Sequence, residues 1–178
     1  MARAVSDWPV VLHGAVVWGL GLSLAIFVIA TLMAGVAPDM FLRSYPPDIQ
    51  RRFGPMSPRA ARLRPYAVAA LGATVLALLL LGLESLRTQS GSVSLAAAVA
   101  FAVTTLMVFN VFDLLVLDWL LFCTIQPRFM ALPGTEGMAA YGDYGFHAVG
   151  FLKGTVFSLV AGSLTAGLWM GAQSLLGR

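Results

Sequence analysis

Residues 91–112 read GSVSLAAAVAFAVTTLMVFNVF and contain no ionisable side chain. A helix of about 20 residues crosses the hydrocarbon core of a bilayer, so this run is long enough to span a membrane. Three other blocks have the same character: residues 10–37, where His13 is the one titratable group, residues 66–83 and residues 154–177. Together these blocks predict four membrane-spanning helices.

The composition agrees with a membrane protein. Of the 178 residues, 59% are hydrophobic and 11% are charged, against about 25% charged in a typical soluble domain. Leu, Ala and Gly dominate, and the sequence lacks the alternating pattern of a membrane β-barrel. We therefore predict an all-α integral membrane protein, a single domain over residues 1–178 whose four helices pack as a bundle, with spans at roughly 10–37, 66–87, 93–125 and 147–174.

The first block is expected to remain as a membrane span. It is longer than the apolar region of a signal peptide, the residues before it mix Arg3 with Asp7, and no A-x-A site ends it. The chain has one cysteine, Cys123. An internal disulfide and redox chemistry based on a C-x-x-C pair within this chain are therefore excluded.

Arginines concentrate in the connection between the first two blocks, residues 38–65. Short loops rich in basic residues stay on the cytoplasmic side, so both termini are predicted on the non-cytoplasmic side. Because motifs of nucleic-acid binding are absent, we expect these arginines to contact anionic lipid headgroups instead of nucleic acid. The six arginines of this first cytoplasmic loop are Arg43, Arg51, Arg52, Arg59, Arg62 and Arg64.

The same loop has signals for short interfacial helices. Pro47 suits the first position of a helix and Gly54 its end, and Ile49 and Phe53 would share a face in the membrane interface. Ser57 and Pro58 form a second start signal. Pro65 then marks either a kink or the beginning of the second span.

Small residues recur every four positions along the fourth span. Such a ridge lets another helix backbone approach closely, and the first span offers a matching surface at Ala15, Gly19 and Ser23, or at Gly21 and Ala25. Packing within one bundle is the expected role, and the seam of a homodimer or larger membrane complex is the alternative. The leucine-rich second span is expected to be the most exposed to lipid. The ridge consists of Gly150, Gly154, Ser158, Gly162 and Ala166.

Two carboxylates interrupt the end of the third span. At 100° per residue in an α-helix, Asn110 and Asp113 share a narrow sector, whereas Asp118 lies about 140° from Asp113. Asp113 is expected to bond Asn110 and to pair with Lys153, the chain's one lysine, which lies at a similar depth near the start of the fourth span. An unpaired charge at that depth is costly.

The cytoplasmic end of the bundle is thus expected to gather a polar cluster. Asp143 would cap the fourth helix, while Tyr141 and Tyr144 suit the headgroup region. A structural ion pair with ordinary helix caps is the alternative to a functional site. The expected cluster comprises Asn110, Asp113, Asp118, Glu136, His147 and Lys153.

Paired metal-ligand spacings such as H-E-x-x-H are absent, so no metal is expected, and the sequence identifies neither a cofactor nor a catalytic residue. His13 and His147 fall on opposite sides of the membrane, which excludes a haem held by both. Three functions remain open. We favour a non-enzymatic accessory or assembly subunit. The alternatives are a small proton- or ion-coupled transporter that uses Asp113 and Lys153, and a membrane enzyme with a metal or acid–base site at Asp113, Asp118, Glu136 and His147.

Overall fold

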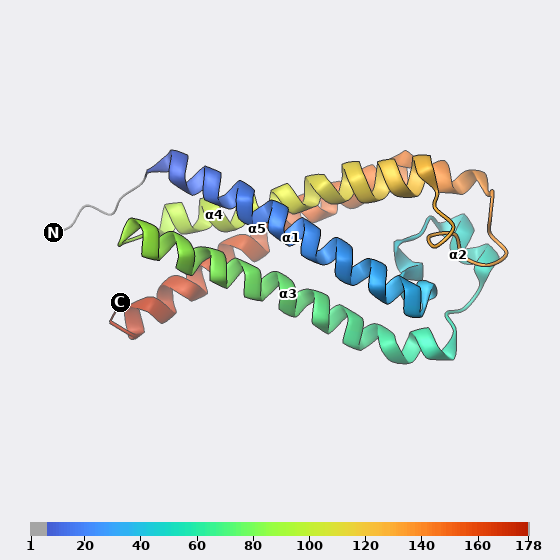
Figure 1. Ribbon diagram of the computed structural model, residues 1–178, viewed down its shortest axis with the longest axis horizontal. Helices are drawn as coiled ribbons and strands as arrows, with labels where there is room; N and C mark the ends of the chain where they lie inside the picture. The colour runs from blue at the N-terminus through green and yellow to red at the C-terminus, as the bar shows by residue number, and fades with distance from the viewer. Residues whose placement is uncertain (1–6, 178) are drawn as a thin grey trace.

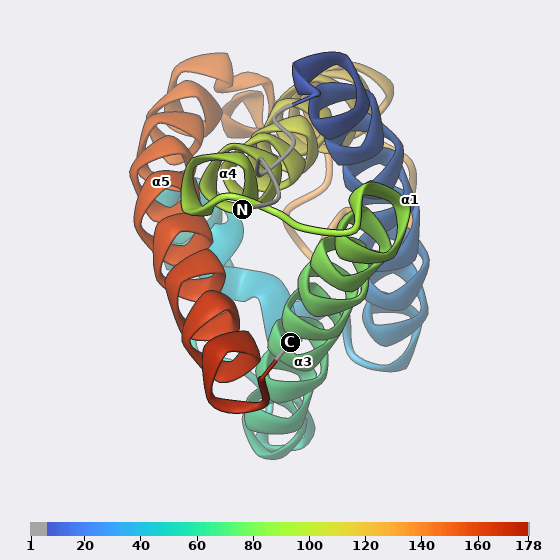
Figure 2. The same cartoon turned by 90° about the vertical axis from the view of Figure 1, so that its left-hand side faces the viewer.

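The structure, a computed structural model, describes residues 7–177 as a bundle of long helices (Figure 1, Figure 2). Within that range, four helical rods are long and apolar enough to cross a membrane. Even the 29-residue α1 exceeds the roughly 30 Å of a hydrocarbon core. The predicted all-α membrane fold with four spanning helices is confirmed. The rods are α1 (Trp8–Val36), α3 (Pro58–Ser90), α4 (Leu95–Phe112) continued by η2 (Asp113–Ile125), and α5 (Tyr144–Leu175).

Shorter elements gather at one end of the bundle, which we call the loop end (Figure 1). They are η1 (Pro38–Ser44) and α2 (Pro47–Phe53), which connect α1 to α3, and η3 (Ala139–Gly142), which belongs to the connection from η2 to α5. The opposite end, called the terminal end, carries the start of α1 and the end of α5. Arg3, which precedes the first span, and Arg178 at the end of the sequence lie outside the described residues.

The helix predicted in the arginine-rich loop is present, and its apolar face packs on other residues of the loop end. α2 begins at Pro47 and ends before Gly54, whose φ of 86° favours glycine. Ile49 has no exposed surface and packs in a cluster with Tyr45, Leu132 and other apolar side chains of the loop end. The expectation that Ile49 faces the membrane interface is therefore wrong, because residues 126–143, which connect η2 to α5 and are called the second loop, fold over it.

The helix of the second span starts at the predicted signal Ser57-Pro58. α3 begins at Pro58, where the Ser57 hydroxyl caps the helix by accepting a hydrogen bond from the Ala60 amide at 3.2 Å. The helix then continues through Pro65. Pro65 therefore lies inside this helix and does not begin it.

The central helix is α4, which contacts α1 and α5 along most of its length. Close approach depends on glycine: a Cβ added at Gly19 of α1 would lie 2.6 Å from the Val108 Cβ, and one added at Gly162 of α5 would lie 2.9 Å from the Val103 amide nitrogen. Helices in lipid gain stability from such van der Waals contact. The packing of α4 between α1 and α5 therefore requires small residues on both partners.

The predicted ridge of α5 packs within the bundle, as expected. Gly154 lies against the Asn110 side chain, and Ser158 is buried next along the same face. Gly150 is different, because it is exposed and a Cβ there would meet nothing within 4 Å. The predicted partner surface is wrong, since Ala15 and Gly19 of α1 pack against α4, not against α5.

The most exposed span is α5, not the leucine-rich second span. In the most apolar window of α5, 11% of residues are buried, against 22% for α3. α3 packs closely at Gly82, where the rings of Phe101 and Trp18 approach its backbone. Phe101 is 1% exposed and lies at the centre of the main apolar core.

The apolar end of η2 is covered by the loops. Phe122 and Cys123 are buried in the loop-end cluster, where Tyr45 and Tyr141 pack edge-on against each other. The Tyr141 hydroxyl accepts a hydrogen bond from the Leu132 amide at 3.0 Å, so this tyrosine is an internal residue and its predicted headgroup position is wrong. Tyr144 is 43% exposed, so it remains available to the headgroup region.

Candidate functional site

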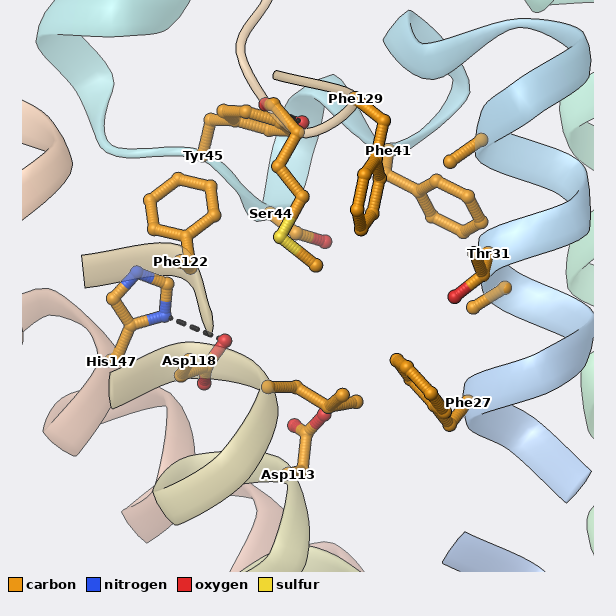
Figure 3. Close-up of a pocket in the computed structure, with 14 residues that line it drawn as sticks. Phe27, Thr31, Phe41, Ser44, Tyr45, Asp113, Asp118, Phe122, Phe129 and His147 are labelled. Atoms are coloured by element: carbon orange, nitrogen blue, oxygen red, sulfur yellow. Dashed lines mark hydrogen bonds and ion pairs between the residues drawn. The ribbon is translucent and has the colours of Figure 1, made fainter. Parts of the chain in front are cut away.

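A cavity of about 160 Å³ lies at the loop end. Figure 3 shows side chains from α1, η1, η2 and the second loop around it. α1 packs along α4 but separates from η2 at this level, so the cavity occupies the space between two diverging helices (Figure 1). Its volume suffices for several water molecules or a small ligand group. The lining consists of Phe27, Ala30, Thr31, Ala34, Phe41, Ser44, Tyr45, Asp113, Leu117, Asp118, Phe122, Phe129, Met130 and His147.

The two carboxylates reach this cavity because η2 is a π-helix. Its hydrogen bonds run between residues five apart, as from the Gln126 amide to the Leu121 carbonyl at 2.8 Å. In such a helix, residues five apart lie about one turn apart. Asp113 and Asp118 therefore face the same cavity instead of diverging by about 140°, the angle of an α-helix. The predicted separation of the two carboxylates is wrong.

Asp118 is paired with a buried histidine. Its Oδ1 atom lies 2.9 Å from Nδ1 of His147, which is 4% exposed. The Phe122 and Phe146 rings pack edge-on against the imidazole, with centroids at 4.9 and 5.2 Å. A carboxylate that accepts from Nδ1 fixes the orientation of the imidazole. Nε2 of His147 is buried and has no hydrogen-bond partner among residues 7–177.

Asp113 points into the cavity without a partner (Figure 3). In the described part of the chain, its carboxylate makes neither a hydrogen bond nor an ion pair, and Lys153 is exposed on α5. The predicted ion pair between Asp113 and Lys153 is therefore wrong. Lys153 lies on the outer face of its helix.

Asn110 belongs to a helix contact, not to the cavity. Its amide nitrogen donates to the Phe151 carbonyl at 3.1 Å and to the Thr155 hydroxyl at 3.2 Å, both on α5. Gly154 leaves the space that the amide fills. The expectation that Asn110 shares a pocket with Asp113 is wrong, because the Asn110 amide is held against α5 and does not line the cavity.

The remaining predicted members have local roles. Glu136 is exposed and accepts a hydrogen bond from the Gly134 amide at 2.9 Å, within its own turn. Asp143 caps α5 by accepting from the Phe146 amide at 2.9 Å, as predicted. The structure thus brings together Asp113, Asp118 and His147 from the expected cluster.

Sequence reasoning missed the walls of the cavity. Phe27 and Thr31 come from α1, and Phe41 and Tyr45 from the first loop, far from Asp113 in the chain. Burial, and secondly Tyr141, raises the pKa of the Tyr45 phenol above its ordinary value of about 10. The phenol therefore stays protonated and donates to the Met130 carbonyl at 2.8 Å, which ties the first loop to the second.

The site has the character of a binding cavity. It combines two carboxylates and an imidazole with four phenylalanines, and within residues 7–177 no three His, Cys, Asp or Glu side chains form a metal-binding group. Apolar walls with few polar groups are typical of ligand sites. Comparison of the chain with protein-family models, curated proteins and solved structures finds no match.

Proposed function

We propose that this small polytopic membrane protein is a non-enzymatic binding protein whose loop-end cavity holds the ammonium group of a ligand. The observation that carries the proposal is the Asp113 carboxylate, which faces the cavity without a counter-charge (Figure 3). The sequence analysis favoured a non-enzymatic accessory or assembly subunit. We retain the non-enzymatic role and propose ligand binding in place of docking on a larger complex.

The energetics of Asp113 favour a cationic ligand. An unpaired carboxylate within a membrane helix costs about 2.5–3.5 kcal/mol on insertion scales. An ammonium group bound beside Asp113 would offset this cost, because it supplies both the counter-charge and hydrogen-bond donors. Asp118 is the second acceptor on the same face of η2.

The aromatic walls support the same ligand class. A cation over an aromatic face gains about 0.5–2 kcal/mol, more where water is excluded. Phe27, Phe41, Phe122 and Phe129 all line the cavity. A primary ammonium fits better than a quaternary one, because two carboxylates and the Thr31 hydroxyl offer acceptors for its N–H groups.

Binding is favoured over transport by the packing of the bundle beyond the cavity. Leu22, Phe101 and Leu106 have at most 2% of their surface exposed, and they belong to one continuous core toward the terminal end. A translocation path through this chain alone would require that core to open. The enzyme alternative has less support, since within residues 7–177 no hydroxyl or thiol forms a hydrogen bond with the imidazole of the Asp118–His147 pair.

We further propose that the loop end faces the cytoplasm, with its exposed arginines against anionic headgroups. Ser57→Cys should then resist a membrane-impermeant thiol reagent applied to intact cells, while Ser90→Cys reacts. The opposite pattern of labelling would place the cavity on the other side of the membrane.

Calorimetric titration with n-octylammonium in detergent tests the binding function. Asp113→Asn should weaken binding at least tenfold, which corresponds to about 1.4 kcal/mol. Asp48→Asn is the matched control, because it removes one exposed carboxylate at the same end and should leave the affinity unchanged. Uncharged 1-octanol controls for partition into the micelle. Equal affinities of the two variants, or of amine and alcohol, would refute the proposal.

A further inference from the structure

An apolar groove runs along the seam between α1 and α4. It has a volume of about 450 Å³ and is open at the surface of the bundle, where Leu20, Val111 and Leu115 are between 39% and 53% exposed. Thr104 supplies the one polar side chain of the lining. The groove is lined by Leu20, Thr104, Met107, Val108, Val111, Phe112, Leu115 and Val116.

The groove and the loop-end cavity follow one another along the same pair of helices. On η2 the two linings overlap over about one turn: the groove extends to Val116, and the cavity runs from Asp113 to Phe122. On α1, the groove contacts Leu20 and the cavity begins at Phe27, which is about 10 Å further along the helix axis. The polar cavity therefore lies toward the loop end, and the apolar groove lies toward the middle of the bundle.

This order of surfaces is the order of groups in an amphiphile. A polar head in the cavity would place an attached hydrocarbon chain along the groove, between α1 and α4. We infer that the ligand of the cavity is a membrane-dissolved, single-chain amphiphile headed by a primary ammonium group, an inference that rests on the proposed function. Its head lies between Asp113 and Asp118, and its chain lies along Val111 and Leu115.

The charges at the loop end favour access from the bilayer over access from water. Arg43 and Arg128 directly adjoin the cavity residues Ser44 and Phe129, and both arginines are exposed. Neither forms an ion pair within residues 7–177. Positive charge at this rim repels a soluble cation, whereas an amphiphile in the membrane would enter the cavity between its α1 and η2 walls.

Photolabelling maps the position of the ligand's hydrocarbon chain directly. The probe is dodecylammonium with a diazirine at the middle of its chain, added to the full-length protein in nanodiscs of zwitterionic lipid, and the labelled peptides are identified by mass spectrometry. Residues 104–116 should carry at least fivefold more label than residues 156–168 of α5, whose exposed apolar face serves as the internal control for lipid contact. Unlabelled dodecylammonium should compete, and dodecanol should not.

Two variants test separately how the ammonium head and the hydrocarbon chain of the ligand bind. Val111→Trp fills the groove and should abolish the excess label on residues 104–116 while calorimetric binding of ethylammonium persists. Val156→Trp on α5 is the matched control, since Val156 is 62% exposed. Asp113→Asn should remove both the excess label and the binding of ethylammonium.

The outcomes distinguish the two proposals. Uniform label over the exposed helix faces, together with Asp113-dependent amine binding, would overturn the inference that the hydrocarbon chain lies in the groove. It would leave the proposed function of the cavity intact. Protection by ethylammonium as strong as that by dodecylammonium at equal aqueous concentration would identify a soluble cation as the ligand and overturn the inference. Label and amine binding that are both unchanged in Asp113→Asn would overturn the proposed function itself.

Discussion

At the terminal end, α4 meets its neighbours through glycines: at Gly82 and Gly162 an added Cβ would lie within 3 Å of atoms of a facing helix. At the loop end, α1 and η2 diverge around a cavity, and an unpaired carboxylate points into it. The terminal end thus has close contact between helices. The loop end has less contact, and polar side chains line the cavity between its helices. Stability and ligand binding are therefore expected to reside in different halves of the same bundle.

The largest effect is expected at the glycine contact of α5. Gly162→Leu would drive a side chain into the Val103 backbone, which cannot yield as a side chain can. We expect a loss of about 3 kcal/mol in unfolding free energy. Thermal unfolding in detergent measures it, with Gly167→Leu as the control, since nothing lies within 4 Å of that site. Equal melting temperatures would show that α5 does not pack closely on α4.

At the loop end, a mutation is expected to increase the unfolding free energy instead of lowering it. Asp113→Leu removes a carboxylate that has no partner in the described structure and adds apolar contact in the cavity, so it should stabilise the protein by about 1 kcal/mol while abolishing amine binding. The measurement pairs thermal unfolding with calorimetric titration. A destabilised Asp113→Leu variant would mean that the carboxylate holds the fold together, and the contrast between the two halves would fail.

A smaller effect is expected from alkaline pH. Because burial raises the pKa of Tyr45, the native state keeps this proton when the unfolded chain loses it, so stability is fully present below about pH 10 and falls as the pH rises further. Tyr45→Phe should reduce the slope of this decline between pH 10 and pH 11. Tyr66→Phe, at an exposed tyrosine, should leave it unchanged. Identical slopes in parent and Tyr45→Phe would place Tyr45 in contact with water.

The architecture could be predicted from the sequence because each apolar block must form a helix to satisfy its own backbone in lipid. The Asp143 cap and the close packing of Gly154 and Gly162 also follow from local patterns. The cavity could not be predicted in the same way. Residues 113–125 contain no glycine or proline that would mark a departure from the α-helix, so the π-helical register of Asp113 and Asp118 leaves no local signal.

Tertiary packing explains the other errors. Thr31 and Phe41 enter the cavity through the arrangement of α1 and the first loop, and neither is marked by spacing relative to Asp113. Depth along a helix could be estimated for Lys153 from residue counts, but the face could not, because α5 is turned by the contact of Gly154 with Asn110. Hydropathy thus predicts which residues share a depth, and packing decides which of them meet.

A double-mutant cycle on n-octylammonium affinity tests most directly whether Asp113 and Asp118 face one ligand. The two aspartates are changed to asparagine singly and together, and a second cycle with Asp113→Asn and Lys153→Met provides the control. If both carboxylates flank the same ammonium, the loss in the double variant should be smaller than the sum of the single losses by about 1.4 kcal/mol, or tenfold in affinity, while the control cycle is additive. Additivity within about 0.5 kcal/mol for Asp113 and Asp118 would contradict the shared cavity.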